Sequence, residues 1–280
     1  MVAAACSSSH LTSTATTGQR PTTTSGSTGG STAALVPGAR YVALGSSFAA
    51  GPGIPTQLAS SCARSDHNYP HLVAAQLKLQ LVDVSCSGAT TASILDQSQL
   101  GNPPQIEAVT ADTALITLTI GGNDIQYTAT TLVCEQNPAC LNSISKSTID
   151  AAVGALPVRL GQLIAALRIR APHAMVVLVT YIQVVPPEGA QCAKLRLSAD
   201  AAAYVAMLGL RLEQTLLAVA KSTGVLLADP YQVTAGHGPC APQGDNWVAG
   251  ARAPQGFPYH PTAVGHEEVA SLVIAALQHS

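Results

Sequence analysis

Five short apolar segments, separated by turn residues and helical patterns, constrain the fold more than any other feature of the chain. They are residues 41–44, 80–84, 114–120, 174–180 and 225–228. Strands that are apolar at successive positions suit a parallel sheet with both faces covered, and alternation with helices is typical of such sheets. The segment 114–120 is rich in β-branched residues, so we expect it at the centre. The sequence therefore predicts a three-layer α/β/α sandwich around a five-stranded parallel sheet.

Helical patterns fill the intervals between the expected strands. The expected helices cover residues 70–79, 103–109, 148–170, 198–222 and 260–278. A proline in a helix interior removes a hydrogen bond, so we expect a break near Pro157. His260 or Thr262 is expected to cap the final helix.

The first 38 residues differ in composition from the rest of the chain. Residues 11–32 consist almost entirely of Ser, Thr, Gly, Gln and Pro, which predicts a disordered tether over 1–38 and one domain over 39–280. Cys6 follows three alanines and precedes three serines, which resembles a bacterial lipoprotein processing site without the preceding signal regions. One expectation is that Cys6 is lipidated and tethers the protein to a membrane. The alternative is an incidental cysteine in a disordered tail.

Six further cysteines lie inside the expected domain, without the short paired spacing of a zinc site. They are Cys62, Cys86, Cys134, Cys140, Cys192 and Cys240. An even number with scattered spacing favours three disulfides, which form in oxidising compartments, so we expect a secreted or cell-surface protein. A net charge of −2 with 10% charged residues argues against a nucleic-acid-binding surface. We expect a monomer.

Residues with catalytic potential follow the ends of three expected strands. Ser47 follows the first, Gly88 the second and Asn123 the third, while His260 begins the last helix. Parallel sheets bind ligands beyond the carboxyl ends of their strands. A serine hydroxyl needs a base, a role that neutral imidazole suits, and the resulting oxyanion needs fixed hydrogen-bond donors. The pattern indicates acyl transfer by serine, with the Ser47 and Gly88 N–H groups and the Asn123 amide as donors.

At these residues the chain resembles the SGNH hydrolases, also called GDSL esterases and lipases. The resemblance spans about residues 40–278. Four separated blocks carry it in family order: Gly45-Ser46-Ser47, Cys86-Ser87-Gly88-Ala89, Gly121-Gly122-Asn123-Asp124 and His260-Pro261-Thr262-Ala263-Val264-Gly265-His266. The resemblance implies a flavodoxin-like fold, Ser47 as nucleophile, His260 as base, and Ser47, Gly88 and Asn123 as the oxyanion hole.

The extracellular actinobacterial lipases and esterases of this family are the most similar, since they also carry three disulfides and an Asn-Tyr-Pro segment, here at 68–70. Family order implies three pairings, all tying loops at the catalytic rim: Cys62 with Cys86, Cys134 with Cys140, and Cys192 with Cys240. No cofactor or metal is implied.

Two positions depart from the family pattern. Ser46 stands where the family has an aspartate that supports the turn. Phe257 stands three residues before His260, where the family has its triad acid. Some extracellular members use a backbone carbonyl there instead, so we expect the carbonyl of Phe257, or one near it, to orient the imidazole. Asp245 is the alternative acid.

Other serine and histidine residues offer alternatives. Ser46 is the rival nucleophile, and His266 is the rival base. We expect His237 at the surface. Three further histidines without visible partners are expected to be solvated: His67, His71 and His173.

The sequence leaves several functions open. The first is hydrolysis of lipid or short acyl esters through an acyl-enzyme. Removal of acetyl groups from cell-wall or other glycans is the second, and acyl transfer to an alcohol uses the same features. A non-catalytic exported binding protein is the alternative from another class.

Overall fold

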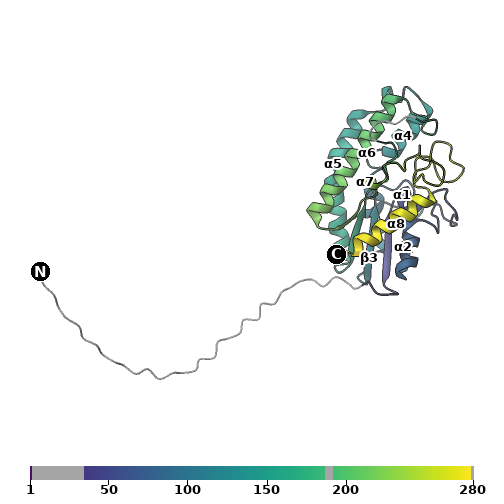
Figure 1. The fold of residues 1–280 in the computed structure, drawn as a ribbon. Helices are drawn as coiled ribbons and strands as arrows, with labels where there is room; N and C mark the ends of the chain where they lie inside the picture. Colours follow the sequence, from purple (N-terminus) through teal and green to yellow (C-terminus); the bar gives the residue numbers. More distant parts are fainter. Residues whose placement is uncertain (2–34, 187–191, 279–280) are drawn as a thin grey trace, which may run out of the picture. The chain divides into compact units, whose positions relative to one another are not determined.

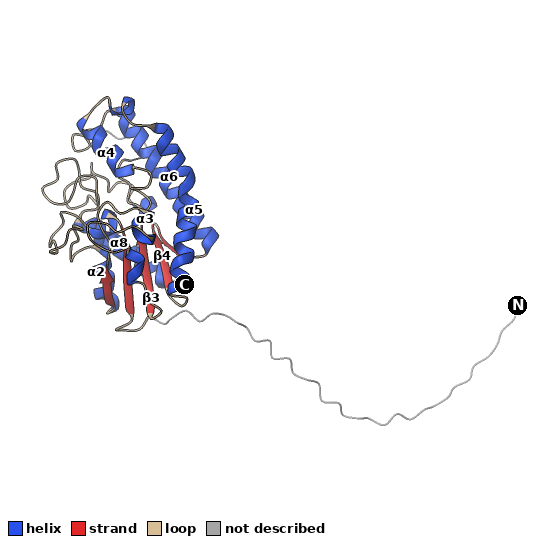
Figure 2. Ribbon diagram, turned by 180° about the vertical axis from the view of Figure 1, so that it is seen from behind, coloured by secondary structure: helices blue, strands red, loops and turns tan. Residues whose placement is uncertain are grey.

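The sheet is five-stranded and wholly parallel, as predicted. In the computed structural model the strands are β1 (Arg40–Gly45), β2 (Gln80–Asp83), β3 (Thr113–Thr119), β4 (Met175–Val179) and β5 (Leu226–Ala228). Their order is β2-β1-β3-β4-β5, the flavodoxin-like order, with β3 at the centre (Figure 2). The structure describes Met1 and residues 35–186 and 192–278. The predicted tether and Cys6 lie outside these residues.

Helices cover both faces of the sheet, which confirms the three-layer sandwich (Figure 1). The α-helices are α1 (Ser47–Ala50), α2 (Tyr69–Leu77), α3 (Thr91–Leu95), α4 (Tyr127–Gln136), α5 (Lys146–Arg170), α6 (Ala199–Thr223), α7 (Pro230–Val233) and α8 (Ala263–Gln278). Two short 3₁₀ helices are η1 (Gln105–Ala108) and η2 (Cys140–Asn142).

Alternation along β1 divides the core into two layers. Tyr41 and Ala43 are buried in the cluster that includes residues of α2 and α8. Val42 and Leu44 point to the opposite face, into the cluster that includes α5 and α6. Successive side chains of a strand point to opposite faces, so an unbroken apolar run is what burial on both faces requires.

Two of the helix predictions are corrected by the structure. Pro157 does not break α5, which runs through it without interruption. Pro157 lies on the exposed side of the helix, away from the side chains that α5 buries. The final helix begins at Ala263, with the Thr262 hydroxyl accepting from the Gly265 N–H at 3.1 Å. Thr262 therefore provides the cap, and His260 lies in the loop before the helix.

Two described helices, α5 and α6, are long and apolar enough to cross a membrane by length and composition alone. Both contribute buried side chains to the core on one face of the sheet.

The three expected disulfides are present with the implied pairings. Cys62–Cys86 joins the loop after α1 to the loop after β2. Cys192–Cys240 joins the loop before α6 to the loop after α7. Cys134–Cys140 lies inside the hydrophobic core, where it fastens α4 to η2. The expectation that all three bonds tie loops at the catalytic rim is therefore wrong for Cys134–Cys140, which ties helical elements of the core.

Register places the ends of β1 and β3 side by side, with Gly45 paired to Thr119. Gly45 has φ +148°, and an added Cβ would lie 2.6 Å from the Thr119 carbonyl oxygen. We expect Gly45→Ala to lower the free energy of unfolding by about 3 kcal/mol, because backbone strain and steric overlap coincide. Urea denaturation measures the loss.

Gly38→Ala is the matched control, since Gly38 has φ +85° with no atom within 4 Å of an added Cβ. It should cost only the strain, about 1 kcal/mol. Equal losses in the two variants would show that close approach to Thr119 does not constrain the turn.

Candidate active site

Ser47 occupies the first position of α1, directly after β1. The preceding turn is held at both ends. The Ser46 N–H donates to the Thr119 carbonyl at 3.0 Å. The buried Gln105 amide accepts from the Gly45 N–H at 2.8 Å and donates to the Gly45 carbonyl at 3.0 Å. These bonds fix where the strand stops and therefore where the Ser47 hydroxyl lies.

His260 reaches Ser47 from the other end of the chain. Its Nε2 lies 2.8 Å from the Ser47 Oγ, and both residues are buried. The backbone around His260 is fixed by two hydrogen bonds. Its N–H donates to the Phe257 carbonyl at 3.2 Å, and its carbonyl accepts from the Ala249 N–H at 2.9 Å.

The imidazole is oriented by a backbone carbonyl, as expected, and the carbonyl is that of Pro258, next to Phe257. His260 Nδ1 lies 2.8 Å from the Pro258 carbonyl oxygen. The Phe257 carbonyl accepts the His260 backbone N–H instead. Since a carbonyl only accepts, Nδ1 carries the proton and Nε2 presents a lone pair to Ser47. Asp245 is not the orienting acid, because Nδ1 of His260 bonds the Pro258 carbonyl.

Two aromatic rings enclose the imidazole. The Phe48 ring centroid lies 4.9 Å from that of His260, and the Phe257 ring meets it edge-on at 5.0 Å. Burial lowers the pKa of His260 from 6.5 to about 4, although the hydrogen bond to Pro258 opposes the shift. The imidazole is therefore neutral at physiological pH, as a general base requires.

The loops that bear Gly88 and Asn123 are bonded to each other and to the turn that bears Ser47. The Cys86 N–H donates to the Gly45 carbonyl at 3.0 Å. Asn123 Nδ2 donates to the Ala89 carbonyl at 2.9 Å, which leaves its second amide hydrogen. Gly88 has φ +84°, and its N–H has no acceptor among the residues that the structure describes.

Asp124 strengthens the link between these loops. Its buried carboxylate accepts from the backbone N–H of Thr91 at 3.0 Å and from the Thr91 hydroxyl. The turn at 121–124 is thus fastened to the start of α3 as well as to Ala89. Asp124, the last residue of the Gly-Gly-Asn-Asp block, therefore stabilises the position of the neighbouring loop that leads into α3.

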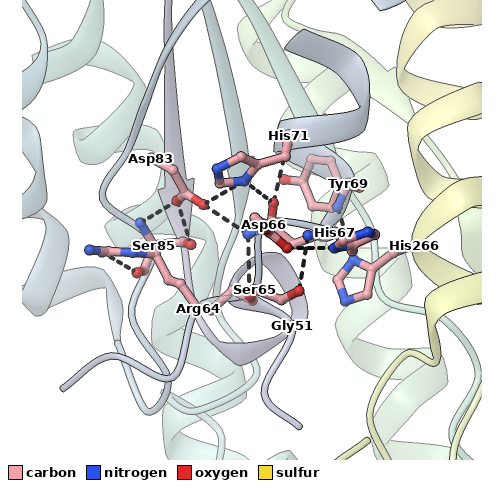
Figure 3. Close-up of polar contacts among 12 residues, drawn as sticks. Gly51, Arg64, Ser65, Asp66, His67, Tyr69, His71, Asp83, Ser85 and His266 are labelled. Atoms are coloured by element: carbon pink, nitrogen blue, oxygen red, sulfur yellow. Dashed lines mark hydrogen bonds and ion pairs between the residues drawn. The ribbon is translucent and has the colours of Figure 1, made fainter. Parts of the chain in front are cut away.

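His266, the rival base, has a different environment (Figure 3). Its Nδ1 accepts from the Tyr69 N–H at 3.1 Å, at the start of α2. The ring is fully buried, and burial lowers its pKa to about 3, with the nearby His260 acting in the same direction. His266 therefore holds α8 against α2 and does not contact Ser47.

Three other histidines, His67, His71 and His237, have partners that the sequence did not reveal. His67 Nδ1 pairs with the Asp66 carboxylate, and His71 Nδ1 lies 2.7 Å from Asn68 Oδ1 (Figure 3). His237 stacks on Trp247 at 4.4 Å. His67 and His173 are exposed, as expected, whereas His71 is half-buried, with its ring against Asn68 at the start of α2.

Residues 43–268 match the GDSL-like lipase/acylhydrolase family. The chain belongs to this family. Its assignment to the GDSL-like family identifies it as a carboxylic ester hydrolase of the serine type, as the resemblance implied.

Curated relatives and solved structures agree with the GDSL-like assignment. The chain is 32% identical to Lipase 2 of Streptomyces coelicolor over 244 residues, which covers 82% of this chain and 83% of that protein. It is also 32% identical to a lipase of Streptomyces rimosus over 233 residues, with 81% and 82% covered.

Among structures, the chain is similar to an extracellular lipase of Streptomyces rimosus, with 30% identity, a TM-score of 0.72, and 85% of this chain and 99% of that chain covered. A phospholipase A1 of Streptomyces albidoflavus gives 28% identity and a TM-score of 0.73, with the same coverage.

Several residues that build this GDSL-like site were missed in the sequence. The sequence pointed to the carbonyl of Phe257 as the orienter of the imidazole, whereas that of Pro258 has this role. Gln105 gave no signal, because its role is visible only once η1 lies beside the end of β1. Tyr181 did give one, since it follows β4 closely, as Ser47 follows β1. Its hydroxyl lies 3.4 Å from the Oγ of Ser46, the rival nucleophile, so the Ser46 hydroxyl is paired with Tyr181.

The two buried imidazoles make stability dependent on pH. Their folded pKa values, about 4 and about 3, lie below the unfolded value of ~6.5. The unfolded chain then binds more protons, so the stabilisation is complete above pH ~6.5 and is lost as pH falls to about 4 for His260 and to about 3 for His266. Urea denaturation should show the free energy of unfolding falling over this window, by on the order of 1 kcal/mol per pH unit for each histidine.

His266→Asn isolates one imidazole, because the amide oxygen can replace Nδ1 as acceptor for the Tyr69 N–H. In this variant the free energy of unfolding should fall less steeply as the pH is lowered. The control is a substitution of the exposed His173 by Gln, which should leave that slope unchanged. An unchanged slope in His266→Asn would contradict the assignment.

Proposed function

We propose that the protein is an exported serine esterase that hydrolyses lipid or short acyl esters through an acyl-enzyme on Ser47. The observation that carries this proposal is the 2.8 Å contact between Ser47 Oγ and His260 Nε2, with Nδ1 held by the Pro258 carbonyl. This geometry satisfies the two requirements for His260 to act as a general base. Its lone pair faces the hydroxyl, and its opposite nitrogen is fixed.

The reaction follows from the direction of these bonds. Ser47 Oγ attacks the ester carbonyl carbon while its proton passes to His260 Nε2. The protonated imidazole then gives that proton to the leaving alcohol oxygen as the tetrahedral intermediate collapses to the acyl-enzyme. Water attacks in the same way, with His260 again as base, and the acid is released from Ser47. The Pro258 carbonyl stabilises the imidazolium, which burial alone would disfavour.

Three donors are proposed to hold the oxyanion. The Ser47 N–H, at the first position of α1, has no acceptor within the helix. The Gly88 N–H has no acceptor among the described residues, and Asn123 keeps one amide hydrogen after bonding Ala89. Removing one such donor typically costs ~10²- to 10³-fold in turnover.

The expectation of a lipid or short acyl substrate rests on the relatives and on one side chain. The similar proteins are named lipases and a phospholipase A1. The Phe257 side chain is 43% exposed while its ring edge meets the catalytic imidazole. An apolar surface is thus available beside His260 for the acyl or alcohol portion of an ester.

Export is supported by the three disulfides, since such bonds persist in oxidising compartments. The similar Streptomyces rimosus lipase is described as extracellular. Lipidation of Cys6 and a monomeric state remain predictions.

Labelling with a fluorophosphonate tests the assignment of the nucleophile. The wild type should label on Ser47, and Ser47→Ala should not label, because the adduct forms on that oxygen. Intact-mass analysis measures the adduct. Ser46→Ala is the matched control and should still label. A wild type that does not react would favour the non-catalytic binding protein. Loss of label in Ser46→Ala, with label retained in Ser47→Ala, would assign the nucleophile to Ser46.

A series of p-nitrophenyl esters tests the substrate class. We expect kcat/KM to be highest for an acyl chain longer than acetyl and to exceed the rate on acetylated glycans, because the surface beside His260 is apolar. Measured release of p-nitrophenol and acetate decides between them. Activity confined to acetylated glycans would favour the deacetylase. Ester product appearing when an alcohol is added would favour acyl transfer.

A further inference from the structure

Tyr181 joins the nucleophile turn to the turn that bears Asn123. It follows β4 closely, and it is 2% exposed. Its hydroxyl accepts from the Gly122 N–H at 2.9 Å and lies 3.4 Å from the Ser46 Oγ. One hydroxyl therefore contacts the residue before the proposed nucleophile and the residue before a proposed oxyanion donor.

The chemistry of a hydroxyl suits both contacts at once. It has two lone pairs and one proton, so it can accept from the Gly122 N–H and donate to the Ser46 Oγ. Burial raises the pKa of the Tyr181 phenol well above its ordinary value, so the proton stays in place. Among the described residues, the Ser46 hydroxyl has no other hydrogen-bond partner.

The Tyr181 ring also limits where the turn can lie. A Cβ added to Gly122 would be 2.8 Å from the ring, so the backbone rests directly on it. The Tyr181 ring also packs against Phe48, with ring centroids 4.6 Å apart. Phe48 in turn packs against the His260 ring. The ring and the hydroxyl of Tyr181 thus both contact the turn at 121–124, and Phe48 connects the ring to the His260 imidazole.

The opposite side of the turn at 121–124 is held independently. Asn123 bonds the Ala89 carbonyl, and Asp124 accepts from Thr91. Tyr181 bonds Gly122 from the side of β4. The Asn123 amide can be aimed within a few tenths of an ångström only if both sides are fixed, which is the accuracy that an oxyanion donor requires.

We propose that Tyr181 is a positioning residue for the oxyanion hole, which it serves by bridging Ser46 and Gly122 through its hydroxyl. The bridge aligns the Asn123 amide with the Ser47 nucleophile, in a chain that has serine where its family has aspartate. This inference rests on the proposed function of Ser47 and Asn123. Tyr181 touches neither substrate nor reacting atom, and it acts through the two turns.

Tyr181→Phe removes the hydroxyl and keeps the ring. We expect kcat on a p-nitrophenyl ester to fall by about tenfold to a hundredfold, with KM changed little, because the donor is misplaced for the transition state and substrate binding is intact. Tyr127→Phe is the matched control. Tyr127 is equally buried and lies edge-on to Tyr181, but its hydroxyl bonds the backbone of Val184. Its kcat should stay within about twofold of the wild type.

A double-mutant cycle separates positioning from general support of the fold. If Tyr181 acts through Asn123, then Tyr181→Phe should lower kcat by less than about twofold when Asn123 is already alanine. The same factor in both backgrounds would overturn the inference, as would wild-type kcat in Tyr181→Phe. Circular dichroism and the unfolding midpoint verify that each variant is folded.

Ser46→Ala provides a second route if Tyr181→Phe does not fold, since it deletes the other end of the bridge. It should lower kcat about threefold in the wild type and leave it unchanged in Asn123→Ala; equal losses in both would overturn the inference. Ser47→Ala distinguishes the two proposals. An active wild type, an inactive Ser47→Ala and an unimpaired Tyr181→Phe would refute the bridge alone. A wild type without esterase activity would refute the proposed function and the bridge together.

Discussion

The hydrogen bond from the Ser46 N–H to the Thr119 carbonyl is the contact on which the rest of the site depends. It extends the pairing of Gly45 with Thr119 one residue past the sheet, so that β1 and β3 end at the same level. Parallel strands carry their loops at one edge, and this register therefore sets the nucleophile turn beside the turn at 121–124. An added Cβ at Gly45 has no room, because the strands approach too closely there.

Orientation of His260 by a carbonyl rather than a carboxylate has physical consequences. A neutral acceptor fixes the tautomer as a carboxylate would, but a hydrogen bond to an ion is roughly twice as strong. Burial lowers the pKa of the His260 ring, and the neutral hydrogen bond to Pro258 opposes that shift only in part. The Pro258 carbonyl must supply orientation from two residues away, so the path of the chain between them matters. Tyr259 adopts φ +60°, and its hydroxyl donates to the Leu195 carbonyl, which anchors that path.

Strands and motif blocks were predictable from the sequence because each has a local signature. Buried parallel strands read as continuous apolar runs, and the four blocks each sit at a strand end or a helix start. Contacts set by tertiary geometry were not predictable. The choice of Pro258 over Phe257 depends on backbone dihedral angles that residue identity does not specify. Gln105 and Tyr181 act on residues more than fifty positions away, and no spacing rule connects them.

The proposed mechanism requires one serine, one imidazole and three donors to converge on a single tetrahedral oxyanion. A crystal structure of the protein after reaction with a p-nitrophenyl alkylphosphonate tests it most directly, because the adduct carries an oxygen where the oxyanion forms. The account predicts phosphorus on Ser47 Oγ, with its oxygen within hydrogen-bonding distance of the Ser47 and Gly88 N–H groups and Asn123 Nδ2. An adduct on another residue, or an oxygen turned away from these donors, would contradict it.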